Sequence, residues 1–270
     1  MEDASGIDEI LAELNPQQRQ AATHGQGPLL IVAGAGTGKT ATLVHRVAWL
    51  MLQGIDPQRI LLLTFTRRAA AEMLRRVDGV LRQLGRTASG KRHSGARVWG
   101  GTFHAIATRL LRQHGKAIGL PAEFSIHDRS DSEDLLNVVR TEQGLAKTDR
   151  RFPKKRTCLD IYSRCVNARR KLDAVLEESF PWCAEWAEQL GPLFDAYVDR
   201  KESAAVLDYD DLLLYWHALL ADPKAVEVIR GQFDCVLVDE YQDTNLLQAE
   251  ILYLLRPDGS GLTAVGDDPQ

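Results

Sequence analysis

A glycine-rich loop near the start of the chain constrains the fold more than any other feature of the sequence. The loop reads Ala-Gly-Ala-Gly-Thr-Gly-Lys-Thr over residues 33–40, directly after the apolar run 29–33 and before a helical stretch over 41–52. Glycines in such a loop let backbone N–H groups turn inward around phosphate oxygens, and the N-terminus of the following helix attracts the same anion. The strand–loop–helix context is the one that a phosphate-binding Walker A loop requires.

The individual positions of the loop predict a site for ATP and magnesium. Lys39 would reach the β- and γ-phosphates, and the Thr40 hydroxyl would hold Mg²⁺. Ala33 stands where the strict pattern has glycine. A dinucleotide fingerprint is excluded because Lys39 occupies the position of its third glycine. The predicted nucleotide-binding residues of the loop are Ala33, Gly34, Ala35, Gly36, Thr37, Gly38, Lys39 and Thr40.

A pair of carboxylates follows a second apolar run and completes the expected site. Asp239 and Glu240 come directly after Val236–Val238. Asp239 would bind magnesium, usually through water, because Mg²⁺ keeps part of its hydration shell. Glu240 would orient and deprotonate the attacking water. Adjacent acids at a strand end are elsewhere often only solvated, but the phosphate loop earlier in the chain favours the catalytic interpretation.

The apolar runs predict an α/β fold built on a parallel sheet with helices on both faces. Four runs indicate buried strands, and each ends at a polar turn. Parallel sheets are buried on both faces, and their ligands bind at the carboxyl ends of the strands. The expected strands are Leu29–Ala33, Ile60–Phe65, Cys235–Asp239 and Leu262–Gly266.

The middle of the chain has a different, helical pattern without a convincing strand. We therefore expect a discontinuous α/β core over 1–104 and 206–270, interrupted by an inserted, mostly helical domain over 105–205. About 200 residues separate the loop from the carboxylates, which is too long for a minimal core and independently favours an insertion. The basic stretch 87–95, rich in glycine and serine, is expected to be a mobile loop. The helices expected in the middle are Ala105–His114, Asp131–Gln143, Cys158–Glu178 and Glu185–Glu202.

The formal net charge of −4 is an average over blocks of opposite sign. Residues 67–112 carry 11 basic and 2 acidic side chains, and residues 140–171 carry 11 basic and 3 acidic ones. Residues 173–270 carry 5 basic and 21 acidic side chains. Such blocks are often solvated faces. The alternative is a track for a polyanion beside a cluster of metal-binding carboxylates.

Other protein classes are excluded by what the sequence lacks. It has no run of 18 apolar residues and no apolar signal core at its acidic N-terminus, so we expect a cytoplasmic protein without a membrane span. The four cysteines show no zinc or iron–sulfur spacing. Reduced, mostly buried thiols are therefore expected at Cys158, Cys165, Cys183 and Cys235.

Taken in order, the motifs resemble the N-terminal half of UvrD/PcrA/Rep-type DNA helicases of superfamily one. Leu14–Gln18 resembles the adenine-reading Q motif, in which the residue matching Gln18 contacts the base. Residues 33–40 and 238–245 resemble motifs I and II. Residues 266–270 resemble the opening of motif III, where the residue matching Gln270 senses the γ-phosphate. The resemblance covers essentially the whole chain and implies that Lys39, Glu240 and Gln270 take part in catalysis. It also implies that the core over 1–104 and 206–270 is RecA-like and that the inserted domain over 105–205 binds DNA.

Two further motifs resemble those that hold single-stranded DNA in the family. They cover residues 64–73 and 101–104. Phe65 and Phe103 stand at expected strand ends, where a base could stack for roughly 1–3 kcal/mol, although Phe65 would equally suit an ordinary core. The resemblance implies DNA contacts by Thr64, Phe65, Arg67, Arg68, Thr102, Phe103 and His104.

Three departures from the family pattern change what is expected. Ala41 replaces an arginine that packs on adenine, which weakens the expected base recognition, and Arg67-Arg68 replace Asn-Lys. The sequence given ends at Gln270, inside motif III. In the family the arginine fingers lie in a second RecA-like domain, and such a finger is worth about 10³–10⁵ in rate. Residues 1–270 alone are therefore expected to be nearly inactive as an ATPase.

The resemblance implies an ATP-dependent DNA helicase or translocase that runs 3′ to 5′ and serves DNA repair or replication. Single-stranded DNA and single-strand/duplex junctions are the implied partners, together with unidentified repair or replication proteins. Two alternatives remain open. One is the motor of a helicase–nuclease complex, which usually carries longer insertions. The other is a nucleotide-dependent DNA-binding or scaffold protein that never unwinds DNA, although such a protein does not need Glu240.

Overall fold

The computed structural model describes residues 10–34, 36–84, 98–146 and 152–267. The chain divides into two compact units. The first unit comprises residues 1–106, 223–244 and 252–270, and the second comprises residues 107–222 and 245–251. The expected mobile loop at 87–95 lies outside the described residues, as do Ala35 and Gln270.

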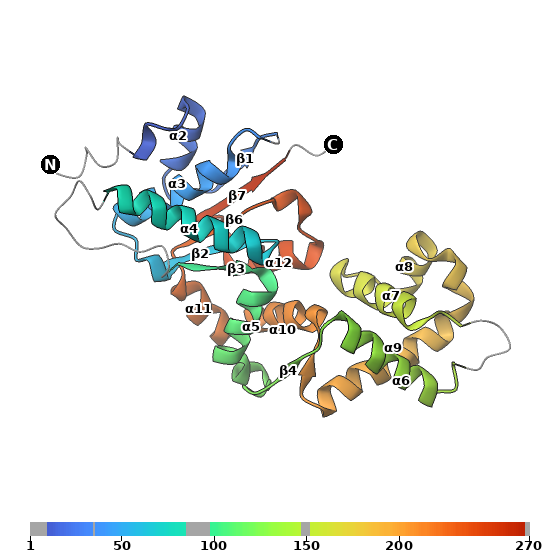
Figure 1. Cartoon of the computed structure of the whole chain (residues 1–270). Helices are drawn as coiled ribbons and strands as arrows, with labels where there is room; N and C mark the ends of the chain where they lie inside the picture. The colour runs from blue at the N-terminus through green and yellow to red at the C-terminus, as the bar shows by residue number, and fades with distance from the viewer. Residues whose placement is uncertain (1–9, 35, 85–97, 147–151, 268–270) are drawn as a thin grey trace. The chain divides into compact units, whose positions relative to one another are not determined.

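A five-stranded parallel sheet forms the centre of the first unit (Figure 1). Its strand order is β1-β7-β6-β2-β3, and every neighbouring pair is parallel. This order brings the ends of β1, β7 and β6 side by side, so the turns that follow them meet at one edge of the sheet. The predicted α/β class with a parallel sheet is confirmed. The strands are β1 (Leu29–Val32), β2 (Ile60–Thr64), β3 (Trp99–Thr102), β6 (Cys235–Val238) and β7 (Leu262–Gly266).

Strand β3 is not among the four apolar runs that predicted strands, although Phe103, which directly follows it, was expected at a strand end. Its residues, Trp-Gly-Gly-Thr, lack the apolar run that marks the other four strands. Gly100 explains this composition, because a Cβ atom there would lie 2.8 Å from the Leu74 Cδ1 atom of α4 (Arg67–Leu84). The edge strand thus uses glycine where a helix packs closely on it.

Helices flank the sheet, and those of the N-terminal part build its main core. Leu43 and Val47 of α3 and Met73 and Val77 of α4 are buried together with Leu62 of β2. The helix α11 lies below the sheet in Figure 1, away from α2 and α3. The helices that contribute to this unit are α2 (Pro16–Ala22), α3 (Lys39–Leu52), α4, α11 (Pro223–Gln232) and parts of α5 (Phe103–His114) and α12 (Leu246–Leu255). Two short 3₁₀ helices, η1 (Pro57–Arg59) and η5 (Tyr241–Asp243), connect elements of this unit.

The second unit is mostly helical and has its own apolar core, to which Leu136, Ile161, Val175 and Leu190 contribute. Its further elements are η3 (Gly115–Ile118), α6 (Arg129–Glu142), α7 (Lys155–Asn167), α8 (Leu172–Ser179), η4 (Pro181–Trp186), α9 (Ala187–Ser203) and α10 (Tyr209–Ala221).

Two expectations for this unit were wrong. A short parallel pair, β4 (Ser125–Ile126) and β5 (Val206–Leu207), lies where no strand was expected, because strands of two residues leave no periodic signal. The single helix expected over 158–178 is two helices, α7 and α8. They are separated where Arg169 adopts a left-handed φ of 54°, a conformation that ends an α-helix.

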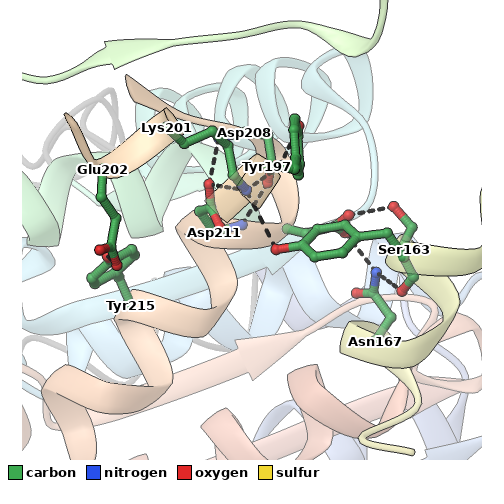
Figure 2. A network of polar contacts seen from close by, with 10 residues as sticks. Ser163, Asn167, Tyr197, Lys201, Glu202, Asp208, Asp211 and Tyr215 are labelled. Carbon is green, nitrogen blue, oxygen red and sulfur yellow. Dashed lines mark hydrogen bonds and ion pairs between the residues drawn. The ribbon is translucent and has the colours of Figure 1, made fainter. Parts of the chain in front are cut away.

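A polar cluster is buried at the centre of the helical unit (Figure 2). Lys201 is 1% exposed, and its ammonium lies 2.6 Å from an Asp208 carboxylate oxygen and 2.7 Å from one of Asp211. The Tyr197 hydroxyl donates to Asp208 at 2.9 Å, and the ammonium also lies 4.4 Å from the centre of the Tyr197 ring. Burial and the neighbouring Asp208 raise the pKa of Asp211 to about 6. The cluster is structural, because all of its members are satisfied by one another.

Candidate nucleotide site and nucleic-acid interface

The phosphate loop joins β1 to α3 and has the backbone conformation that its glycines predict. Gly36 and Gly38 adopt left-handed φ values of 78° and 87°, which other residues rarely reach. The Thr37 hydroxyl donates to the Gly34 carbonyl at 2.7 Å, which closes the loop on itself. Helix α3 begins at Lys39, two residues earlier than expected, so Thr40 lies in its first turn.

Lys39 is held between the loop and the end of β7. Its ammonium donates to the Ala33 carbonyl at 3.1 Å and forms an ion pair with Asp267. The Ala33 N–H donates to the Gly266 carbonyl at 3.1 Å, which extends the pairing of β1 with β7 by one residue. The basic group predicted to bind phosphate is therefore fixed at the edge of the sheet where β1 and β7 end.

The predicted carboxylates lie at the same edge, because β6 is the next strand after β7. Asp239 is 5% exposed, and its Oδ1 atom has no hydrogen-bond partner among the residues that the structure describes. Burial and the adjacent Glu240 raise the pKa of Asp239 to about 6. A buried carboxylate oxygen without a donor fits a hydrated Mg²⁺, which would supply the missing hydrogen bond and the compensating charge.

Glu240 is presented by a strained backbone. Its φ of 52° is left-handed, a conformation that costs a glutamate of the order of 1 kcal/mol and is often found at functional sites. The Gln242 side-chain amide donates to the Glu240 carboxylate at 2.8 Å. The structure thus brings Lys39, Asp239 and Glu240 together in one unit, as the sequence predicts.

Gln18 contacts the phosphate loop directly. Its side-chain amide donates to the Thr37 carbonyl at 2.8 Å, and its carbonyl oxygen accepts from the Asn15 N–H at 3.0 Å. A Cβ atom at Gly38 would lie 2.5 Å from the Gln18 amide nitrogen, so the close approach requires glycine there. The predicted base-reading residue and the phosphate loop form one connected surface.

Arg46 is a supporting residue that the sequence reasoning missed. It lies on α3, is 1% exposed, and donates to the Thr263 hydroxyl of β7 at 2.8 Å. Its other donors bind carbonyls that follow α2, at His24 (2.7 Å) and Gly25 (3.1 Å). Arg46 therefore ties the helix that carries Gln18 to the helix that follows the phosphate loop. A lone arginine in an apolar helix is the only signal that could have identified it.

The predicted DNA-contact arginines lie at the start of α4. Arg67 and Arg68 are exposed, and neither has an ion-pair partner within the described part of the chain. Further along α4, Arg75 and Arg76 are both paired with Glu72 at 2.7 Å. An open pocket of about 450 Å³ lies beside this turn and is lined by Thr66, Arg68, Ala69, Glu72 and Arg76. The first turn of α4 thus carries positive charge that no ion pair neutralises within the described residues.

The remaining predicted DNA contacts differ in exposure. Phe65 is half-buried, whereas Phe103 is 1% exposed and packs on Phe65 with ring centres 6.1 Å apart. Phe103 directly follows β3, as expected, but it is buried because α5 begins at this residue and turns it into the core. Thr64 is also fully buried, and its hydroxyl donates to the Thr66 carbonyl. Of the two aromatic residues, only Phe65 offers a partly open surface for stacking in this structure.

Two polar residues of this region support the backbone. The Thr102 hydroxyl accepts from the Ala105 N–H at 3.2 Å and so caps α5. Burial lowers the pKa of His104, which keeps this imidazole neutral at pH 7. A neutral imidazole can hydrogen-bond to DNA but adds no charge to the interface.

Part of the basic charge of the helical unit is used in ion pairs. Lys155 pairs with Asp134, Arg169 with Glu250 at 3.1 Å, and Arg170 with Glu178. These pairs lower the net positive charge that the sequence block 140–171 suggests.

Among the residues that the structure describes, no cluster of three or more His, Cys, Asp or Glu side chains could hold a metal ion. The four cysteines are free thiols, and three of them are buried. No helix within the described ranges is long and apolar enough to cross a membrane.

The parallel sheet, the glycine loop after β1 and the carboxylates after β6 define a P-loop nucleotide-binding core. Comparison with known proteins gives a narrower result: the UvrD/REP helicase N-terminal domain matches residues 14–270. The chain belongs to the UvrD/REP helicase family.

Individual relatives agree with this family. The chain is 39% identical over 249 residues to "ATP-dependent DNA helicase UvrD1" of Mycobacterium tuberculosis, covering 90% of this chain and 30% of the relative. It is 36% identical over 264 residues to "DNA helicase II" of Escherichia coli, covering 97% of this chain and 34% of the relative. It is 34% identical over 268 residues to "ATP-dependent DNA helicase PcrA" of Leuconostoc citreum, covering 98% and 34%. The chain thus spans about a third of the length of these curated relatives.

Proposed function

We propose that these residues form the first motor domain of an ATP-dependent DNA helicase or translocase. The observation that carries the proposal is the meeting of three groups at one edge of the sheet. They are the Lys39 ammonium, the unpartnered Asp239 carboxylate oxygen and the strained Glu240. The names of the relatives, which are ATP-dependent DNA helicases, support the same activity.

Each group has a distinct task in this proposal. Lys39 binds the β- and γ-phosphates, and the loop N–H groups and the helix N-terminus neutralise their charge. Thr40 and Asp239 hold Mg²⁺, which supplies charge to the phosphates when it is bound. Glu240 accepts the proton of the attacking water. Gln18 reads the base and Gln270 contacts the γ-phosphate, as their positions in the family motifs imply.

We assign the proposed contacts with nucleic acid first to the exposed arginines of α4. Arg67 and Arg68 contact phosphates of single-stranded DNA, and Phe65 offers a partly open surface on which a base can stack. The proposed insertion, residues 105–205, meets the duplex at a single-strand/duplex junction. A 3′-to-5′ polarity and a place in DNA repair or replication complete the proposal. Residues 1–270 alone bind nucleotide but hydrolyse it slowly, because the family's arginine fingers lie in another domain.

Replacement of Lys39 by alanine tests the nucleotide site. The variant is expected to bind Mg·ATP about 10–100-fold more weakly, because charge-assisted hydrogen bonds contribute about 1.5–3 kcal/mol. Isothermal titration calorimetry with Mg·ATP measures this change. Lys116→Ala, which removes an exposed lysine of η3, serves as the control and is expected to bind like the wild type. Equal affinities of the Lys39→Ala and wild-type chains would rule out the proposed phosphate site.

The arginines at the start of α4 are tested by the salt dependence of DNA binding. Because each phosphate contact releases about 0.7 counterion from a single strand, removing both Arg67 and Arg68 is expected to reduce the slope of log Kd against log salt by about 1.4. Fluorescence anisotropy with a labelled oligothymidine measures both slopes. Arg82→Ala, at an exposed position on the same helix, is the control and should leave the slope unchanged. If the double variant kept the wild-type slope, these arginines would not face the DNA.

A further inference from the structure

Asp267 is an acidic residue to which the sequence motifs assign no role, yet it holds the lysine of the phosphate loop. Its carboxylate forms an ion pair with the Lys39 ammonium. The Lys39 side chain is 9% exposed and the Asp267 side chain is 36% exposed. The pair is thus partly shielded from water, where an ion pair is stronger than on an open surface.

The β1–β7 pairing fixes Asp267 next to the loop. Val32 lies opposite Gly266 in the parallel register, and the Ala33 N–H donates to the Gly266 carbonyl at 3.1 Å. Lys39 donates to the carbonyl of the same Ala33. The backbone positions of Lys39 and Asp267 relative to each other are therefore set by the pairing of β1 with β7.

A second contact fixes Asp267 from the side of β6. The Asp267 N–H donates to the Gln242 side-chain oxygen at 3.0 Å, and the amide group of Gln242 donates to Glu240 at 2.8 Å. Gln242 packs so closely that a Cβ atom at Gly266 would lie 2.8 Å from its side-chain oxygen. Gln242 thus connects the backbone that carries Asp267 to the carboxylate of Glu240.

The number of donors on Lys39 makes the pair a competitor of the ligand. An ammonium group has three N–H donors, and the Ala33 carbonyl and Asp267 engage two of them. Binding to both the β- and γ-phosphates needs two donors, so Asp267 or Ala33 must give one up. The Asp267 carboxylate also repels the phosphates, because it carries the same sign of charge.

We propose that Asp267 is a specificity-determining residue that competes with nucleotide phosphates for the Lys39 ammonium. This inference rests on the proposed nucleotide site. ATP needs two donors of Lys39 and therefore competes with Asp267 directly, whereas ADP can use the free donor and meets only the charge of Asp267. The competition thus lowers the affinity for ATP most, for ADP less, and not for AMP, whose phosphate does not reach Lys39. The affinity of the site for its nucleotide is therefore lower than the phosphate loop alone would give, which favours release of the nucleotide.

Replacement of Asp267 by asparagine tests the proposal, because it removes the charge at almost constant shape. Titration calorimetry of the 270-residue chain with Mg·ATP, Mg·ADP and AMP is the measurement. We expect Asp267→Asn to bind Mg·ATP about 5–10-fold more tightly and Mg·ADP more tightly by a smaller factor, with AMP affinity unchanged. Asp267→Glu, which keeps the charge, should remain near the wild type. Glu227→Gln, at an exposed position on α11, controls for the change in net charge.

A double-mutant cycle with Lys39→Ala separates competition from other effects. In the Lys39→Ala background, Asp267→Asn should no longer tighten Mg·ATP binding, because nothing remains to compete for. Asp267→Ser provides a second neutral variant if asparagine disturbs the fold. Unchanged or weaker Mg·ATP binding by both neutral variants would overturn the proposal, as would a gain that persists without Lys39. A wild-type chain without measurable affinity for Mg·ATP would instead contradict the proposed function, and the inference with it.

Discussion

Replacing Lys201 with methionine is expected to lower the free energy of unfolding by about 3–5 kcal/mol, because it leaves two buried carboxylates without their cation. Lys201 is 1% exposed and pairs with both Asp208 and Asp211. Methionine keeps the length and the apolar stem of the side chain, so the loss reports the charge. Urea denaturation followed by circular dichroism measures it, provided that the slope against urea stays constant.

The pH dependence of this loss gives an independent check. Burial already raises the pKa of Asp211 to about 6 in the folded protein, and the Lys201 ammonium opposes this rise. Without the ammonium, the folded-state pKa of Asp211 should rise further above its value in the unfolded chain. A raised carboxyl pKa contributes stability at low pH that disappears as the pH rises through the folded value. The difference between variant and wild type should accordingly be smaller at pH 5 than at pH 8.

A matched substitution controls for the loss of a lysine. Lys155→Met removes an exposed lysine of the same unit, which pairs with Asp134 at the surface. Its unfolding midpoint should stay at the wild-type value, because exposed ion pairs contribute little. Equal effects of the Lys201 and Lys155 substitutions would show that the buried cluster is not a stabilising element.

Replacing Arg46 with methionine is expected to lower the free energy of unfolding by roughly 3 kcal/mol or more, because buried carbonyls lose a charged donor. The carbonyls of His24 and Gly25 accept from this guanidinium, as does the Thr263 hydroxyl. Burial lowers the pKa of Arg46, but its carbonyl acceptors keep the charged form satisfied. Urea denaturation measures the loss, and Arg82→Met, at an exposed position on α4, is the control.

Arg46→Met should also weaken nucleotide binding, although Arg46 is not one of the residues proposed to contact the nucleotide. The helix α2 carries Gln18, and Arg46 ties the residues after α2 to α3. Loss of this tie should weaken ATP binding more than binding of inorganic triphosphate, which lacks the base that we propose Gln18 contacts. Calorimetry with both ligands tests this difference. In the urea denaturation experiment, a variant as stable as the wild type would mean that water replaces the hydrogen bonds of the guanidinium.

The sequence predicted the elements that repeat a simple pattern. The four apolar strands lie within one residue of their expected bounds, because a buried parallel strand is a continuous apolar run. The phosphate loop was predictable because its backbone conformation requires glycine, as Gly36 and Gly38 show. The carboxylates Asp239 and Glu240 followed from their place after a strand.

The contacts that join distant segments could not be predicted. The pairing of Asp267 with Lys39 depends on β1 and β7 being neighbours in the sheet, although 228 positions separate the two residues. Arg46 and Lys201 look like surface charges in the sequence, and only their acceptors in the fold make their burial possible. The burial of Phe103 could not be predicted, because a helix begins at this residue directly after a strand that consists partly of glycine.

The left-handed backbone of Glu240 constrains how this position can vary over evolutionary time. Glycine would relieve the strain, so a change that removes the carboxylate would stabilise the local backbone. If Glu240 is the base that we propose, selection for stability and selection for turnover act in opposite directions at this position. A glutamate that persists there would then be kept by its chemistry, so position 240 would record whether a lineage still uses the proposed ATPase.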